Sequence, residues 1–150
     1  MPDSGGSWSY QHRDLGEPRL PDGSPILRPC VLVAPPVTGD AVVAVVDSGA
    51  PITVAAPTLL ASLGIDLEAT SPIMEVPLGI AGASGVVPIY DVELDLIPPD
   101  DVEATPRRWH LPVAAQARWR LPFAVLLGQR GWFDTFPTTI DANTTTVHLS

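Results

Sequence analysis

Short apolar runs alternate with turn-forming residues along most of the chain. Residues 29–34 and 41–46 are apolar and rich in valine, and Thr38-Gly39-Asp40 lies between them. Runs of this length around a glycine-containing turn are typical of a β-hairpin. A second, longer pattern of the same kind spans residues 73–96 around a glycine-rich centre at 79–85. The pattern therefore predicts two hairpins in the first two thirds of the chain.

Helical spacing is convincing only in residues 57–63, and Gly64 ends that stretch. Residues 98–108 are charged and contain proline, which predicts an exposed loop, and residues 110–119 are expected to return as a strand. The last part predicts three further strand segments, of which the second and third form a hairpin around Ala142-Asn143: 123–127, 138–141 and 145–149.

The first 25 residues differ from the rest because they are rich in Gly, Ser, Pro and charge. We interpret them as a flexible N-terminal arm, followed by one folded domain over residues 26–150. A chain of 150 residues with 45% hydrophobic residues can bury one core. Its 18 prolines interrupt long helices, so we predict an all-β fold with one or two short helices.

Charge and cysteine content narrow the possible partners. The net charge of −9 leaves no basic surface for nucleic acid or an anionic membrane, and no apolar run is long enough to span a bilayer. Cys30 is the only cysteine and cannot form an internal disulfide, and the N-terminus has no secretion signal pattern. The sequence therefore predicts a cytoplasmic protein.

The most informative short motif is Asp47-Ser48-Gly49-Ala50, which directly follows the apolar run 41–46. An aspartate after a strand commonly caps the next turn by accepting hydrogen bonds from the backbone, so the motif can be explained by structure alone, without a catalytic role. The same tripeptide occurs at Asp3-Ser4-Gly5 without any strand before it. The surrounding segments, and not the tripeptide, must therefore decide whether Asp47 is catalytic.

Over residues 26–149 the chain resembles the retropepsin-like aspartic proteases in three segments that occur in the same order. These are the turn at 47–50, the glycine-rich hairpin tip at 79–85, and the apolar-apolar-Gly segment 123–128 followed by Gly131-Trp132-Phe133, which leads into a short helix in the family. The resemblance implies a closed β-barrel of the acid-protease fold, an aspartic endopeptidase that hydrolyses extended polypeptides, and a homodimer. It also implies roles for individual residues: catalytic Asp47, catalytic-turn support from Ser48, Gly49 and Ala50, and a substrate-binding flap formed by Gly79, Ile80, Ala81, Gly82 and Ala83.

Metal-free peptide hydrolysis uses two carboxylates around one water molecule, one accepting its proton while the other donates to the scissile carbonyl. This chain offers one convincing aspartate. The resemblance supplies the second by two-fold symmetry, so that Asp47 is used twice. Neither a cofactor nor a metal is expected, since His12, His110 and His148 lack the spacing of metal ligands.

The chain departs from the family pattern at two places. Many relatives have an arginine directly after the glycine of the third segment, whereas this chain has Gln129 and then Arg130; Pro51 stands where an acidic partner for that arginine can occur. The hairpin tip has no aromatic residue. One alternative for the dimer is addition of the C-terminal strand 145–149 to a shared sheet.

Two other functions stay open from the sequence. The first is a noncatalytic retropepsin-like module for dimerisation or peptide binding. The second is a monomeric all-β domain with a coincidental turn at Asp47. A serine hydrolase is disfavoured, because Ser48 has no G-x-S-x-G setting and no histidine partner. Two groups are interpreted as structural: the solvated carboxylates Asp91, Glu93 and Asp95, and the packing residues Trp109, Trp119 and Trp132.

Overall fold

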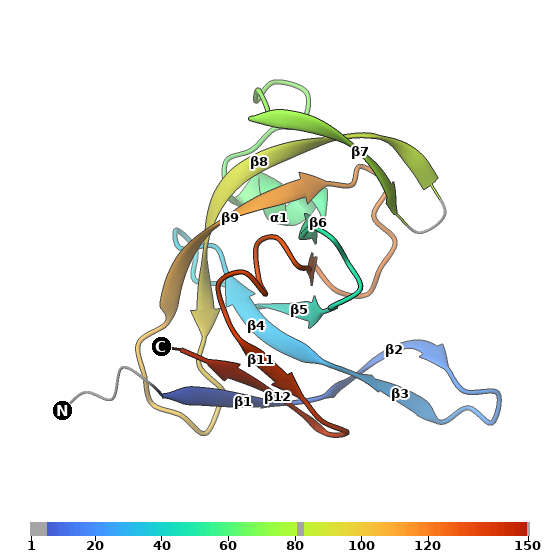
Figure 1. Ribbon diagram of the computed structural model, residues 1–150, viewed down its shortest axis with the longest axis vertical. Coiled ribbons are helices and arrows are strands. Elements are labelled where there is room, and N and C mark those ends of the chain that lie inside the picture. Colours follow the sequence, from blue (N-terminus) through green and yellow to red (C-terminus); the bar gives the residue numbers. More distant parts are fainter. Residues whose placement is uncertain (1–5, 81–82, 150) are drawn as a thin grey trace.

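Six strands close into a barrel in the computed structural model, which describes residues 6–80 and 83–149 (Figure 1). Their order is β4–β5–β10–β6–β9–β8, and β8 pairs back with β4 to close the ring. The barrel strands are β4 (Cys30–Ala34), β5 (Val42–Val46), β6 (Val54–Ala55), β8 (Ala83–Ile97), β9 (Arg107–Ala115) and β10 (Val125–Leu127). The predicted all-β class and the predicted closed barrel are confirmed.

The two predicted hairpins are present. β4 and β5 pair antiparallel around a turn in which Gly39 adopts a positive φ of 70°. β7 (Met74–Ile80) pairs antiparallel with the first part of β8. β8 is 15 residues long, so its later part can pair with β9 and its last residues with β4. This single strand therefore connects the long hairpin to the barrel.

The later predictions also hold, with small shifts at the ends. β11 (Thr138–Ile140) and β12 (Thr144–His148) form the predicted C-terminal hairpin. The predicted loop at 98–108 is shorter by two residues, because β9 begins at Arg107. α1 (Pro57–Ser62) is the predicted helix, with proline in its first turn and Gly64 at a φ of 81° after its end. No helix of the described residues is long and apolar enough to cross a membrane.

The prediction of a flexible arm over residues 1–25 is wrong for the part that the structure describes. β1 (Ser7–Gln11) pairs antiparallel with β12 and buries Trp8 and Tyr10, which alternate with exposed polar residues. The Tyr10 hydroxyl donates to the carbonyl of Ile97 at 2.5 Å, and burial raises its pKa. The two aromatic side chains belong to the main core cluster, so β1 is part of the folded body.

β2 (Arg13–Arg19) and β3 (Pro25–Arg28) form a separate two-stranded hairpin. It extends away from the barrel at the lower right of Figure 1. β3 leads into β4 after one residue, so the hairpin is a continuation of a barrel strand. From here on, the arm means this hairpin, residues 13–28, and not the flexible N-terminal arm that was predicted for residues 1–25.

The expected short helix after Gly131 is absent, since this segment forms consecutive turns and α1 is the one α-helix of the described residues. Backbone bonds from Thr135 and Phe136 to the carbonyl of Trp132, at 2.9 and 2.8 Å, close the last of these turns. Trp132 is fully buried and packs against Phe136. The side chains therefore occupy the expected place in the core, but Pro137 and the following strand end the turns before a regular helix forms.

Candidate active site

β5 carries Asp47 to the end of the barrel beside a parallel strand. β10 pairs with β5 in register Val125↔Ala44, Leu126↔Val45 and Leu127↔Val46. The backbone N–H of Asp47 then donates to the carbonyl of Leu127 at 2.9 Å. Both strands are apolar and largely buried because each lies inside the sheet. The backbone of Asp47 is therefore fixed by two segments that are 80 residues apart in the sequence.

The four residues of the Asp-Ser-Gly-Ala motif form one tight turn. The N–H of Gly49 donates to Oδ1 of Asp47 at 2.9 Å, and the N–H of Ala50 donates to the carbonyl of Asp47 at 3.2 Å. Asp47 is half-buried, Ser48 and Gly49 are exposed, and Ala50 is buried. The carboxylate is thus oriented by its own turn while one face of the turn stays open.

The segment after β10 runs against the next residues of this turn. Backbone bonds join Gln129 N–H to the carbonyl of Ala50 at 2.8 Å and Arg130 N–H to the carbonyl of Pro51 at 3.1 Å. The side-chain amide of Gln129 also donates to the carbonyl of Ser48 at 2.6 Å. Gln129, which the sequence marked only as a departure from the family pattern, therefore braces the Asp47 turn from within its own chain.

Thr53 is the residue of this region that sequence reasoning missed. Its side chain is fully buried, accepts from the N–H of Gly128 at 3.1 Å, and donates to the carbonyl of Arg130 at 2.9 Å. A threonine in the otherwise apolar stretch 52–56 was the only available signal. The hydroxyl therefore connects the segment that follows the Asp47 turn to residues 128–130, which follow β10.

Two glycines allow this close approach. A Cβ on Gly128 would lie 2.5 Å from the carbonyl oxygen of Ile52 and 2.7 Å from that of Ala50. Gly131 has a φ of 103°, and a Cβ there would lie 2.6 Å from Oγ1 of Thr53. Only glycine permits both contacts without a shift of backbone. The Gly128–Gly131 segment is therefore matched in shape to the segment 50–53.

Two tryptophans fix the outer side of this segment. Trp109 donates through Nε1 to the carbonyl of Gly131 at 2.9 Å, and Trp132 donates to Oγ1 of Thr138 at 3.0 Å. Their rings meet edge to face with centroids 5.8 Å apart. The prediction that these tryptophans are packing residues is confirmed for Trp109 and Trp132. Trp119 is partly buried and packs edge to face on Phe123.

The predicted flap corresponds to the end of the β7–β8 hairpin. Gly79 pairs with Ser84 and Ile80 pairs with Ala83, so three of the five predicted flap residues lie in the ladder. Ala81 and Gly82 lie outside the described residues. Figure 1 shows the described ends of β7 and β8 on the same side of the barrel as the end of β5. The end of the hairpin and the Asp47 turn therefore lie at the same side of the barrel in this view.

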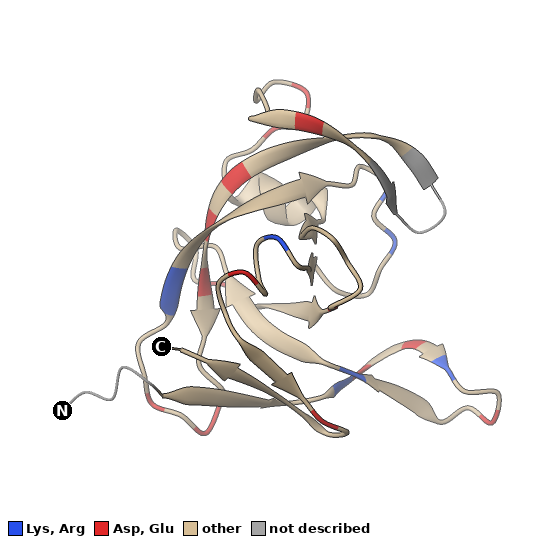
Figure 2. Cartoon of the chain, viewed as in Figure 1, with Lys and Arg blue, Asp and Glu red and all other residues tan. Residues whose placement is uncertain are grey.

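The remaining polar candidates lie elsewhere, on β8 and β9. Arg108 forms a two-bond contact with Asp95 at 2.9 and 3.3 Å, and His110 lies 2.7 Å from Glu93 and 3.6 Å from Asp91. Figure 2 shows charged residues following these two strands. The carboxylates interpreted as solvated are thus cross-strand partners as well. Residues 6–80 and 83–149 hold no group of three or more His, Cys, Asp or Glu that could bind a metal ion.

Comparison with known proteins found a similarity in three-dimensional structure but no match in sequence. Neither a protein-family model nor a curated protein sequence matches this chain. Among solved structures, a retropepsin-like aspartic protease from Rickettsia conorii is similar with a TM-score of 0.55. The similarity covers 96% of this chain and 93% of that chain, at 12% sequence identity. At that identity the comparison concerns the fold alone, and this chain has the retropepsin-like fold: a mostly β, closed barrel.

Proposed function

We propose that this protein is an aspartic endopeptidase in which Asp47 is the catalytic carboxylate. The observation that carries the proposal is the position of Asp47 at the end of β5, held by Leu127 from the parallel strand and oriented by the N–H of Gly49. A turn that served only to reverse the chain would not need a neighbouring segment shaped around it by Gly128 and Thr53. The retropepsin-like fold supports the same general kind of function.

The mechanism needs a second carboxylate, and a two-fold homodimer supplies it. Two carboxylates about 3 Å apart hold one proton between them, so one acts as base toward a water molecule while the other acts as acid toward the scissile carbonyl. The open face at Ser48 and Gly49 is where a second copy can approach. In this arrangement the Ser48 hydroxyl is available to bond across the dimer, and Ala50 anchors the turn in the core.

The substrate class proposed is an extended polypeptide. A peptide between the Asp47 turn and the β7–β8 hairpin can pair its backbone with strand ends, as in other cases of strand addition. Gly79, Ile80, Ala81, Gly82 and Ala83 are proposed to form the flap over it. The chain carries a net charge of −9, so substrates with basic side chains are favoured over acidic ones.

A noncatalytic dimerisation or peptide-binding module is the second candidate. The observation that favours it is Gln129, because its amide is satisfied by Ser48 within the same chain. No cation then occupies this position to form an ion pair within the dimer. Such a module would bind peptides without turnover.

The test compares cleavage of a mixed peptide library by the wild type, Asp47→Asn and Asp40→Asn, read by mass spectrometry from acidic to neutral pH. Asp40 is exposed at the other end of the β4–β5 hairpin and provides a matched control. Cleavage by the wild type and Asp40→Asn, with a bell-shaped pH dependence on the acidic side and none by Asp47→Asn, is the expected result. Equal cleavage by Asp47→Asn would refute the proposal. Binding without cleavage by any of the three proteins would favour the module.

A further inference from the structure

The arm, residues 13–28, begins beside the Asp47 turn. In the β4–β5 hairpin Cys30 lies opposite Val45, and the N–H of Val46 donates to the carbonyl of Pro29 at 2.9 Å. Because the strands are antiparallel, the chain before Pro29 continues in the direction in which β5 runs toward Asp47. The arm therefore extends past the turn on the side where Asp47 is presented.

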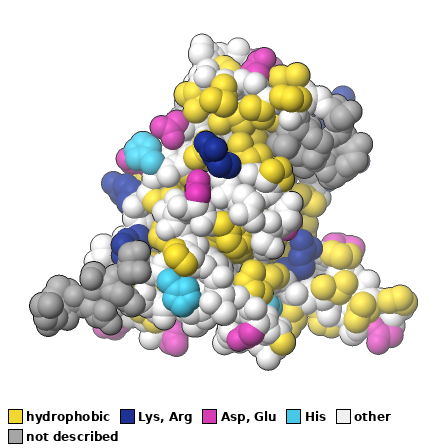
Figure 3. All heavy atoms as spheres, viewed as in Figure 1, with side chains coloured by type: hydrophobic (Ala, Val, Ile, Leu, Met, Phe, Trp, Pro, Cys, Tyr) yellow, Lys and Arg dark blue, Asp and Glu magenta, His cyan; other side chains and the backbone are white. Residues whose placement is uncertain are grey.

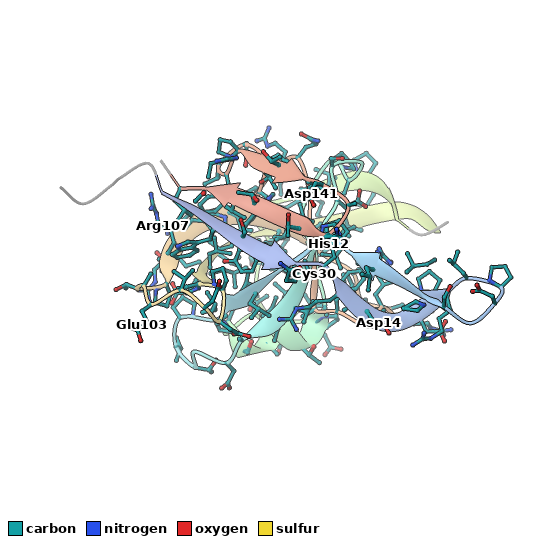
Figure 4. All side chains as sticks on the ribbon, turned by 90° about the horizontal axis from the view of Figure 1, so that it is seen from below. His12, Asp14, Cys30, Glu103, Arg107 and Asp141 are labelled. Atoms are coloured by element: carbon teal, nitrogen blue, oxygen red, sulfur yellow. The ribbon has the colours of Figure 1, made fainter. Side chains whose placement is uncertain are left out.

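The arm extends far beyond this point. β3 has four residues, which span about 13 Å at the usual rise of a strand, and the turn at 20–24 lies beyond them. Figure 1 shows the arm on the same side of the barrel as the end of β5, and Figure 4 shows it from below, with Asp14 on the arm and Cys30 at its base. If two Asp47 turns meet at a two-fold axis, an arm that continues past the turn extends toward the other copy.

The C-terminal strand cannot provide the shared sheet that the sequence suggested as an alternative. β12 is the central strand of a three-stranded sheet, with β1 on one edge and β11 on the other. Both edges of β12 are therefore occupied within one chain. A dimer of this protein must use another segment. β1, β11 and β7 each lie at the edge of a larger sheet, whereas β2 and β3 pair only with each other among the described strands.

The surface of the arm suits a protein partner. Leu20 is 49% exposed and Leu27 is 47% exposed, and Figure 3 shows hydrophobic side chains gathered along the arm at the lower right. A two-stranded hairpin is marginally stable in water unless something covers it. The arm carries three arginines and three carboxylates, so it is neutral on a chain whose net charge is −9 (Figure 2). It can therefore approach a second copy without the repulsion that the rest of the surface would cause.

The base of the arm is fixed to the body. Leu15 packs against the buried cluster of Cys30, Val45 and Phe123, and the guanidinium of Arg28 lies 5.9 Å from the centre of the Phe123 ring. The direction of the arm is thus set by contacts near the Asp47 turn, while its outer half has no such contacts from the described part of its own chain.

From these observations we infer that the arm is the dimer clasp: it crosses the two-fold axis and packs Leu20 and Leu27 against the partner copy. The inference rests on the proposed function, since that function requires two Asp47 turns to meet. The occupant is a second copy of this chain, and by symmetry each dimer contains the contact twice.

The experiment measures dimerisation of the full chain by sedimentation velocity over a wide concentration range. Leu20→Gln with Leu27→Gln is compared with the wild type and with a matched double variant, Val37→Gln with Ile73→Gln, whose side chains are also exposed but lie outside the arm. The arm variant should weaken dimerisation about tenfold or more, whereas the matched variant should dimerise as the wild type does. Circular dichroism checks that each variant is folded.

Amide hydrogen exchange of the wild-type protein tests the same dimer contact without any mutation. Amides of residues 13–28 should become protected as the concentration rises into the dimeric range. Equal dimerisation by the arm variant and the wild type, or arm amides that exchange equally fast in monomer and dimer, would overturn the inference. A wild type that stays monomeric would overturn it as well.

Peptide cleavage by the same samples separates this inference from the proposed function. A dimer that depends on the arm but shows no Asp47-dependent cleavage would support the proposed dimer contact and refute the proposed peptidase activity. Asp47-dependent cleavage by a dimer whose stability does not change on substitution of Leu20 and Leu27 would support the peptidase activity and refute the proposed dimer contact.

Discussion

Gly128→Ala is the substitution that most directly tests how the Asp47 turn is held. The new Cβ would lie 2.5 Å from the carbonyl oxygen of Ile52 and 2.7 Å from that of Ala50, and both are backbone atoms that no rotamer change can move. Normal contact requires about 3.2 Å or more, so segment 50–52 must shift by roughly 0.7 Å. Overpacking of this kind costs typically 1–3 kcal/mol, and we expect about 2–3 kcal/mol because two carbonyls are involved.

The loss should appear both in stability and in activity. For a chain of 150 residues, 2–3 kcal/mol corresponds to a decrease of about 5–10 °C in Tm. The shifted carbonyl of Ala50 also accepts the bond from Gln129, so the displacement is passed to the turn that orients Asp47. If Asp47 is catalytic, a displacement approaching 1 Å should lower kcat about 100-fold.

Thermal unfolding followed by circular dichroism provides the measurement, with Gly85→Ala as the matched control. Gly85 lies in β8 with no atom within 4 Å of an added Cβ and without a positive φ, so its substitution should leave Tm nearly unchanged. A Gly128→Ala protein that melts together with Gly85→Ala would refute the reasoning. It would mean that the two segments are not in close contact in solution.

Three further predictions concern neighbouring groups. Thr53→Val keeps the shape of the side chain but leaves the N–H of Gly128 without its acceptor, so urea unfolding should show a decrease of about 2 kcal/mol in the free energy of unfolding. Thr53→Ser keeps the hydroxyl and should largely avoid this loss, and equal stability of the two variants would contradict the role of the hydroxyl. Gln129→Ala removes an exposed hydrogen bond to the carbonyl of Ser48, so it should change the free energy of unfolding by less than about 1 kcal/mol but clearly reduce the rate of peptide cleavage. An unchanged cleavage rate would contradict the proposal that Gln129 braces the Asp47 turn. Burial raises the pKa of Cys30 to about 11 and leaves its side chain without exposed surface, so at pH 8 the native thiol should react with a thiol reagent at least about 100-fold more slowly than the thiol of the unfolded chain. A fast reaction of the native protein would show that the thiol is accessible.

Local pattern was sufficient for most strands of the barrel. The β4–β5 hairpin and the long β7–β8 hairpin were predictable because apolar runs around glycine-containing turns require only neighbouring residues to be read. The predicted flexible arm failed for the opposite reason. Trp8 and Tyr10 alternate with polar residues over only five positions inside a stretch rich in Gly, Ser and Pro, and their burial depends on β12 at the other end of the chain.

The candidate site divides in the same way. Asp47 stood out in the sequence because a carboxylate directly after a buried-looking strand needs a reason, and the motif Ser48-Gly49-Ala50 around it was visible at once. Thr53 did not stand out, because its role depends on Gly128 and Arg130, which are more than 70 residues away. Gln129 could be recognised as a departure, but its bond to the Ser48 carbonyl is a property of the folded turn.

The sequence by itself determined most of the strand-forming segments, the position of α1 and the identity of the candidate carboxylate. These follow from side-chain periodicity and turn chemistry, which act over a few residues. Tertiary structure alone decided that β10 lies parallel to β5, that β12 is enclosed by β1 and β11, and that residues 13–28 extend past the Asp47 turn. Strand partners and strand directions depend on which distant segments bury their apolar faces together, and a linear pattern of residues does not specify that choice.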